Sequence, residues 1–183
     1  MITPIAEHLV DLDILPAKAK ILDIGARGFE FTNYFRQRDY YVIAVDIDTL
    51  TDGQYFHCAI SDFDGLCGLV KSNDAQATKI DKIGTGIECY TLKSFSEMIG
   101  IQFWDLVKVD VEGSEYEIIM TLDEPPAKQL SIEFHLHTGI YQQHEVDLMI
   151  DKLRGLGYSV ASHEYTEQHG MGFNFWSSLF ILK

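Results

Sequence analysis

Apolar residues occur along this chain in short runs of the length typical of β-strands. Seven runs are rich in β-branched and aromatic residues, which pack well on a pleated sheet. They are Lys20–Ile24, Tyr41–Val45, Tyr55–Ile60, Leu106–Val111, Leu130–Leu136, Tyr158–Ser162 and Phe175–Leu182. Strands with such continuous apolar character are usually covered on both faces. We therefore predict a central sheet with helices on each side.

Segments with helical spacing lie between several of these runs. The longest is Tyr141–Leu156, where apolar residues recur every three or four positions and glycines can end the helix. The other predicted helices are Phe29–Arg38, Lys93–Met98 and Ser114–Leu122. Alternating strands and helices predict an α/β fold with a mostly parallel seven-stranded sheet. The last two strands have no helix between them, so we expect an antiparallel hairpin at one edge.

The segment Gly65–Glu88 lacks this patterning. It is polar and poor in aromatic residues, so we predict a long loop or a short excursion of the chain. Loops of this length in a compact domain are commonly functional or mobile. Nothing in the segment resembles a linker between domains. Residues 1–183 are therefore expected to form a single domain, which is an ordinary length for one.

The charge of the chain restricts its partners. Lys and Arg number 14 against 28 Asp and Glu, for a formal net charge of −14. Nucleic acid would be repelled by most of such a surface, so we predict no nucleic-acid partner. No apolar run approaches the ~20 residues that span a bilayer, and the first residues lack the pattern of a signal peptide. With three cysteines and no CxxC pair, we expect a cytoplasmic protein without membrane association.

The strongest local motif is the glycine turn ILDIGARGFEF. A predicted strand ends near Asp23, and Gly25 and Gly28 permit a sharp turn into a helix whose first N–H groups are free. Asp46 follows Gly25 by 21 residues, the spacing of an acid that holds a ribose hydroxyl. Arg27 stands where a dinucleotide site needs its second glycine. This favours S-adenosylmethionine (SAM) over a nicotinamide cofactor, and a plain turn without ligand is the remaining alternative.

Ionisable side chains alternate along the fourth and fifth strongly apolar runs. They are Lys108, Asp110 and Glu112 on one, and Glu133, His135 and His137 on the next. Such groups are costly within a covered sheet unless they are paired or functional. Both sets lie toward the carboxyl ends of their strands, the edge where open α/β sheets bind ligands. We predict one site built from both strands, the alternative being pairs that satisfy buried polarity.

A divalent metal is a further possibility for the histidines. His135 and His137 with a carboxylate offer nitrogen and oxygen ligands, and His163 and His169 can add to them. Two histidines two positions apart are a weak signal. We therefore favour proton transfer or polar contacts for these side chains and assign no metal ligands from the sequence.

Together these motifs resemble the FkbM-type family of SAM-dependent methyltransferases. ILDIGARGFEF is similar to the cofactor turn of that family, AVDID to its ribose-binding segment and CAISDFDG to its third-strand segment. DLVKVDVEGSEYEII is the most specific match, and IEFH fits the fifth strand. The resemblance covers residues 20–136 and implies a Rossmann-like class I methyltransferase fold.

The resemblance also implies roles for particular residues. The implied cofactor-binding residues are Asp23, Gly25, Ala26, Arg27, Gly28, Asp46, Ile47, Ser61, Asp62 and Asp110. The candidates for proton transfer and acceptor orientation are Asp110, Glu112, Glu133 and His135. The implied reaction is O-methylation of a hydroxyl on a small molecule or carbohydrate. A Rossmann-like module that binds the cofactor without catalysis is the main alternative, and a nicotinamide oxidoreductase is the third.

Overall fold

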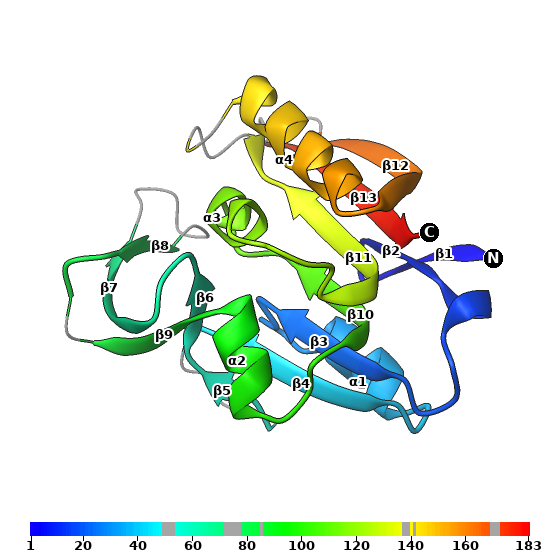
Figure 1. Ribbon diagram of the computed structural model, residues 1–183, viewed down its shortest axis with the longest axis horizontal. Coiled ribbons are helices and arrows are strands. Elements are labelled where there is room, and N and C mark those ends of the chain that lie inside the picture. The colour runs from blue at the N-terminus through cyan, green and yellow to red at the C-terminus, as the bar shows by residue number, and fades with distance from the viewer. Residues whose placement is uncertain (49–53, 72–77, 85, 137–139, 141, 169–172) are drawn as a thin grey trace.

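The computed structural model describes residues 1–48, 54–71, 78–84, 86–136, 140, 142–168 and 173–183 (Figure 1). Its main feature is a seven-stranded sheet with the strand order β12-β13-β11-β10-β3-β4-β5. The strands are β3 (Lys20–Ile24), β4 (Tyr41–Asp46), β5 (Phe56–His57), β10 (Trp104–Val109), β11 (Ala127–Phe134), β12 (Tyr158–Gln168) and β13 (Phe173–Leu182). The five strands from β11 to β5 run parallel. β13 is antiparallel to β11, and β12 to β13. The predicted mostly parallel sheet with an antiparallel edge hairpin is confirmed.

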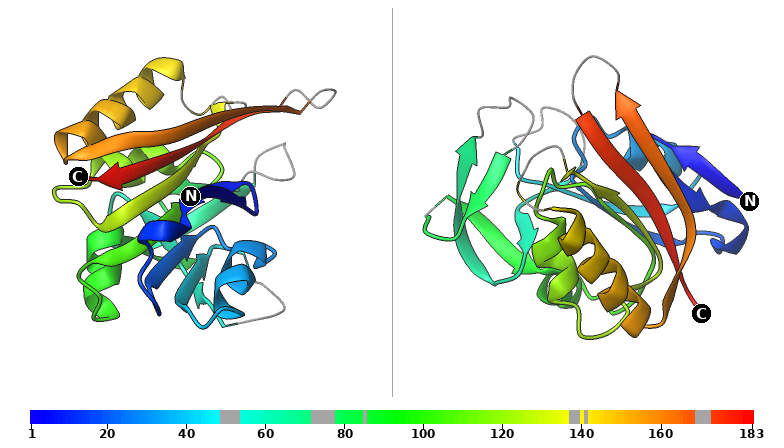
Figure 2. Two further views of the ribbon diagram at one scale, coloured as in Figure 1. Left: turned by 90° about the vertical axis from the view of Figure 1, so that its right-hand side faces the viewer. Right: turned by 90° about the horizontal axis from the view of Figure 1, so that it is seen from above.

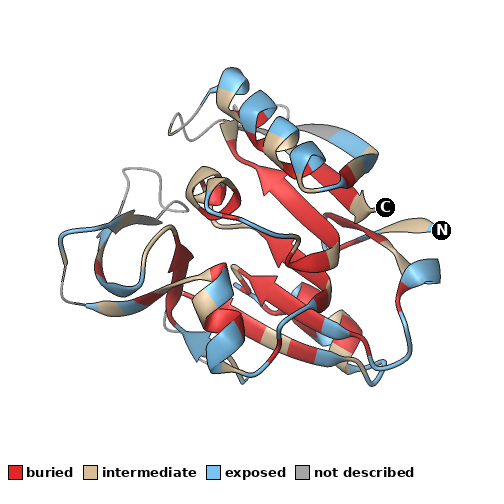
Figure 3. Ribbon diagram, viewed as in Figure 1, coloured by how far each residue is buried: buried red, intermediate tan, exposed pale blue. Residues whose placement is uncertain are grey.

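Helices cover both faces of this sheet, as the apolar strands predicted. One face carries α1 (Glu30–Arg36), whose Phe31 and Phe35 pack against β3 and β4. The other face carries α2 (Leu92–Met98), α3 (Glu115–Met120) and α4 (Gln143–Gly155). The left view of Figure 2 separates these two layers, and Figure 3 shows the central strands as the most buried part of the chain. Within the described residues, no helix has the length and apolar character needed to cross a membrane.

The prediction of a loop over Gly65–Glu88 is wrong. The segment contains β7 (Gly65–Lys71), β8 (Thr78–Asp81) and the start of β9 (Ile87–Thr91), and these join β6 (Ala59–Ser61) in a second sheet of order β6-β9-β7-β8. This sheet projects from the body in Figure 2, right. Its small core consists of Ala59, Cys67 and Cys89 with a few partly buried neighbours. Leu66, Leu69 and Val70 of β7 are exposed, so the apolar residues of this sheet do not mark one buried face.

The predicted strand Tyr55–Ile60 is two strands that belong to different sheets. Residues Phe56–His57 form β5 at the edge of the main sheet, and the chain changes sheets at Cys58 before β6 begins. Because both halves are apolar, the sequence pattern did not show the break.

An N-terminal hairpin that the sequence pattern did not predict lies beside β11 and β13. It consists of β1 (Ile2–Ile5) and β2 (His8–Asp11), followed by the short 3-10 helix η1 (Leu12–Ile14). The buried Gln129 side chain bonds both main-chain groups of Asp11, at 3.0 and 3.1 Å. Ser177 Oγ donates to the carbonyl of Glu7 at 2.8 Å. These bonds carry His8 to the carboxyl end of the main sheet.

A buried tyrosine joins the edge hairpin to the centre of the sheet. The hydroxyl of Tyr158 donates to the Ala127 carbonyl at 2.5 Å and accepts from the Ala127 N–H at 3.3 Å. We expect Tyr158→Phe to lower the free energy of unfolding by about 1–3 kcal/mol, because two buried main-chain groups lose a partner. Urea unfolding measures this, with Tyr41→Phe, 53% exposed, as the control. Equal stability of the two variants would contradict the prediction.

Candidate functional site

The predicted glycine turn is present and is held against two neighbouring strands. Gly25 and Gly28 have φ values of +82° and +80°. The N–H groups of Gly25 and Ala26 both donate to the Val45 carbonyl, at 2.9 and 3.1 Å. A Cβ placed on Gly25 would lie 1.7 Å from the carbonyl oxygen of Asp110. Only glycine therefore fits where β3 passes closest to the chain leaving β10.

A cavity of about 470 Å³ opens at the carboxyl ends of β3, β4 and β10. Its lining includes Gly25, Arg27, Asp46, Ile47, Asp110 and Glu112. Burial raises the pKa of Asp46, and its Oδ1 accepts from the Asp48 N–H at 2.8 Å. Six predicted residues are thus brought together around one nucleoside-sized space.

Other predicted cofactor residues lie beside this cavity. Ser61 and Asp62 contact other side chains rather than the cavity. Ser61 Oγ donates to Asp62 at 3.3 Å, and Lys82 forms an ion pair with Asp62. Cys58 and Ile60 line the cavity at this point instead. Gly28, with its positive φ, forms part of the turn that leads into α1.

A second cavity of about 430 Å³ adjoins the first, between the N-terminal hairpin and the start of α1. Its lining includes Glu7, His8, Asp23, Ala26, Glu30 and Lys108. Arg27 and Asp110 line both cavities, so the two spaces meet at these side chains. The sequence reasoning missed this cavity because it did not predict the hairpin that forms one wall.

Lys108 is a buried cation between the two cavities. Its Nζ lies 3.1 Å from Asp23 Oδ1 and 3.2 Å from Asp110 Oδ2, and it donates to the Gly25 carbonyl at 2.6 Å. Burial alone would lower the pKa of Lys108, but the two carboxylates outweigh it and raise that pKa above its ordinary value. Burial alone would raise the pKa of Asp110, but the charge of Lys108, the hydrogen bond from His8 and the charge of His135 hold it well below its usual range.

The four predicted catalytic side chains converge beside Lys108. His135 Nε2 lies 3.4 Å from Asp110 Oδ1, 3.6 Å from Glu112 Oε2 and 3.8 Å from Glu133 Oε1. Asp110 and His135 lie just beyond the ends of β10 and β11. Glu112 follows in a turn with φ +55°. The predicted strand ends at Val111 and Leu136 were therefore too late, and a turn rather than strand alternation brings Glu112 into the cluster.

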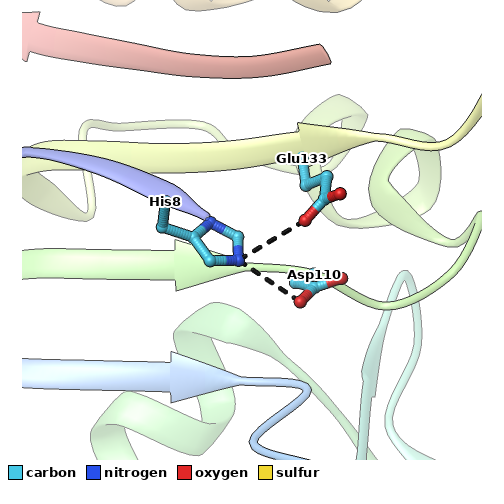
Figure 4. Close-up of side chains that lie close together, drawn as sticks. All are labelled: His8, Asp110 and Glu133. Carbon is cyan, nitrogen blue, oxygen red and sulfur yellow. Dashed lines mark hydrogen bonds and ion pairs between the residues drawn. The ribbon is translucent and has the colours of Figure 1, made fainter. Parts of the chain in front are cut away.

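Two further residues complete the cluster and were not predicted from the sequence. His8 Nε2 lies 3.3 Å from Asp110 Oδ2 and 3.6 Å from Glu133 Oε2 (Figure 4). His135 Nδ1 lies 2.7 Å from Oε1 of the fully buried Glu115. Glu115 belongs to the DVEGSE motif and its position there was a usable signal, whereas the short run around His8 gave none.

Burial and charge set different protonation states within this cluster. Burial lowers the pKa of His8. Burial, with the nearby charge of Asp110, raises the pKa of Glu133 to about 8. Burial alone would lower the pKa of His135, but the carboxylates of Glu115 and Asp110 raise it to about 10. Burial therefore favours the neutral forms of His8 and Glu133, and the neighbouring carboxylates favour the cationic form of His135.

Among the other histidines considered as metal ligands, only His163 lies in the described part of the chain, and it is not part of this cluster. His163 lies on β12 and its Nδ1 is 2.6 Å from Ser178 Oγ. His137 and His169 fall outside the described residues.

Comparison with known proteins identifies the family. The model of the FkbM methyltransferase domain matches residues 11–160. The chain belongs to the FkbM methyltransferase family. A search of curated proteins finds no relative that matches the sequence.

Solved structures agree with this FkbM assignment at the level of the fold. The chain is similar to the 1,6-didemethyltoxoflavin-N1-methyltransferase of Burkholderia thailandensis, solved with its substrate and S-adenosylhomocysteine (SAH), with a TM-score of 0.52. The identity is 12% over 90% of this chain and 71% of that one. The magnesium protoporphyrin IX methyltransferase of Synechocystis PCC 6803, with bound SAM, gives a TM-score of 0.49, 14% identity, and coverage of 92% and 71%. The similarity to the Burkholderia thailandensis enzyme confirms the predicted class I methyltransferase fold.

Proposed function

We propose that this protein transfers a methyl group from SAM to a hydroxyl of a small molecule or carbohydrate. The proposal rests on the acid–histidine cluster, which consists of Asp110, Glu112, Glu133 and His135 with His8 and Glu115. This cluster lies beside the 470 Å³ cavity. Asp110 and Glu112 line the cavity and also belong to the acid–histidine cluster. A group bound in the cavity is therefore next to side chains that can orient an acceptor and take its proton.

The cavity has features suited to the adenosine part of SAM. Asp46 lies at the end of β4, where its carboxylate can accept from ribose hydroxyls, and Ile47 supplies an apolar wall beside it. The Gly25–Gly28 turn allows the cofactor to approach the main chain. Asp23 and Glu30, lining the second cavity, favour a cationic ammonium there.

We place the methyl acceptor beside the acid–histidine cluster. When bound, SAM supplies a methyl group on a sulfonium, which an acceptor oxygen can displace directly. Glu112 lines the cavity and burial raises its pKa, so it is the carboxylate suited to take the hydroxyl proton, and the remaining side chains hold the acceptor in line. The net charge of −14 disfavours phosphate-rich acceptors and nucleic acid.

Ligand binding and turnover separate this proposal from its alternatives. A ligand that binds the folded state raises stability by about 2.7 kcal/mol at one hundred times its Kd. We expect SAH to raise the Tm, and labelled SAM to methylate a member of a panel of sugars and small alcohols. No shift with millimolar SAH would overturn the proposal. A shift without transfer to any acceptor favours a binding module, and a shift with NAD but not SAH favours an oxidoreductase.

Asp46 gives a specific test of the cofactor position. We expect Asp46→Asn to weaken SAH binding by about 10- to 100-fold, because hydrogen bonds to a charged group contribute about 1.5–3 kcal/mol. Burial already disfavours the charged form of Asp46, so the Tm of the free protein is not expected to fall. Calorimetric titration with SAH measures the affinity.

The matched control is Asp39→Asn, at a carboxylate whose side chain is 90% exposed beyond α1. Asparagine tolerates its φ of +62°. Equal affinity of the two variants for SAH would remove Asp46 from the cofactor site.

A further inference from the structure

Negative charge is concentrated where β10 and β11 end. Five carboxylates lie within this region, on Asp23, Asp110, Glu112, Glu115 and Glu133. Lys108 pairs with the first two. The other three face histidines, and Glu115 and Glu133 are buried. Buried carboxylates need a compensating positive charge, which the cationic form of His135 supplies together with Lys108, and which a metal ion can supply in place of the His135 proton.

Two groups of side chains in this region have the spacing of metal ligands, and they share Asp110. One is His8 with Asp110 and Glu133, and the other is His135 with Asp110 and Glu112. On the first side, Asp110 Oδ2 faces His8 at 3.3 Å but also lies 3.2 Å from Lys108 Nζ. Figure 4 shows how His8 approaches Asp110 and Glu133 from the hairpin. A metal ion there would meet the ammonium, so the His8 side is disfavoured.

On the second side the geometry suits an ion. The oxygens of Asp110, Glu112 and Glu133 lie 3.4, 3.6 and 3.8 Å from His135 Nε2. Ligand atoms about 2.1 Å from one ion are separated by these distances when they subtend angles of about 110–130°. Such angles occur in tetrahedral and distorted five-coordinate sites. Asp110, Glu112 and His135, whose ligand atoms all lie within 4.8 Å of one another, need little movement to enclose one ion.

The orientation of His135 is an independent feature of metal sites. A histidine ligand usually donates its other ring N–H to a carboxylate, which turns the free nitrogen toward the metal. His135 Nδ1 has such a partner in Glu115 Oε1 at 2.7 Å. That oxygen is itself held by the N–H groups of Val111 and Gly113, each at 3.3 Å. The structure therefore fixes Nε2 toward the three carboxylates through a buried support.

We propose that Asp110, Glu112 and His135 bind a divalent ion of the Mn²⁺ to Zn²⁺ series, with Glu133 as a further oxygen beside His135 and Glu115 as the positioning residue. Mixed imidazole and carboxylate ligands suit this series. The sequence alone did not favour a metal because it paired His135 with His137, whereas the structure supplies ligands from both strand ends. The inference deepens the proposed function and rests on it: an ion beside the cavity stabilises the negative oxygen of a hydroxyl acceptor.

Binding of Mn²⁺ to the chelator-treated full chain tests this proposal. The loss of the free Mn²⁺ signal in electron paramagnetic resonance is expected to show one bound ion per chain. Glu115→Gln keeps every ligand but is expected to weaken binding by about 10- to 100-fold. Glu112→Gln, at a partly exposed ligand, is expected to weaken it further, and His163→Gln is the control that leaves it unchanged.

Two outcomes overturn the proposal, and neither depends on turnover. No Mn²⁺ or Zn²⁺ binding to protein that still gains stability from SAH would mean that a protonated His135 balances the carboxylates. Binding that His8→Gln abolishes and Glu112→Gln leaves intact would place the ion on the other side of Asp110. Because SAH binding is measured on the same metal-free protein, failure of the metal site and failure of the cofactor site are distinguishable.

Discussion

Gly25→Ala is expected to abolish detectable SAH binding and to destabilise the protein. Its new Cβ would lie 1.7 Å from the Asp110 carbonyl oxygen and 2.8 Å from the carbonyl carbon, both main-chain atoms that cannot rotate away. The φ of +82° adds backbone strain. Together these effects are expected to cost about 2–5 kcal/mol of unfolding free energy. A loss of about 100-fold in SAH affinity corresponds to about 2.8 kcal/mol of binding free energy. A displaced turn with an energetic cost in this range is therefore sufficient to abolish detectable binding.

Gly100→Ala is the matched control for this variant. Gly100 has a similar φ of +75°, yet a Cβ there would meet no atom within 4 Å. Its expected cost is the backbone strain alone, about 1 kcal/mol, with SAH affinity unchanged. Urea unfolding and calorimetric titration on both variants separate strain from collision. If the two variants lose equal stability and both bind SAH normally, the close approach of the turn to Asp110 has no functional importance.

The glycine turn was predictable because its chemistry is local. Strand, turn and helix follow one another within Lys20–Arg36, and the ribose-binding candidate comes from the next strand. The meeting of the acids on β10 and β11 also followed from the sequence. Neighbouring parallel strands place their carboxyl ends together, and the register that pairs Val109 with Ile132 puts Asp110 beside Glu133.

The parts that the sequence missed depend on long-range packing. His8 reaches Asp110 across 102 positions only because Gln129 and Ser177 hold the N-terminal hairpin on the sheet. Nothing local to His8 signals that contact. The second sheet was missed for a different reason, since its short strands bury few apolar side chains. Sequence reasoning therefore identified the lining of the first cavity better than that of the second, one wall of which is the N-terminal hairpin.

Lys108→Met is expected to lower the free energy of unfolding by about 3–5 kcal/mol, because it leaves Asp23 and Asp110 without their buried cation. It also removes the bond that Nζ donates to the Gly25 carbonyl, so SAH affinity is expected to fall as well. Lys82→Met breaks the exposed pair with Asp62 and is expected to cost at most about 1 kcal/mol. Urea unfolding of both variants measures the difference. Equal costs would mean that water or relaxation compensates the two carboxylates, and that Lys108 does not organise the glycine turn and the acid–histidine cluster as one site.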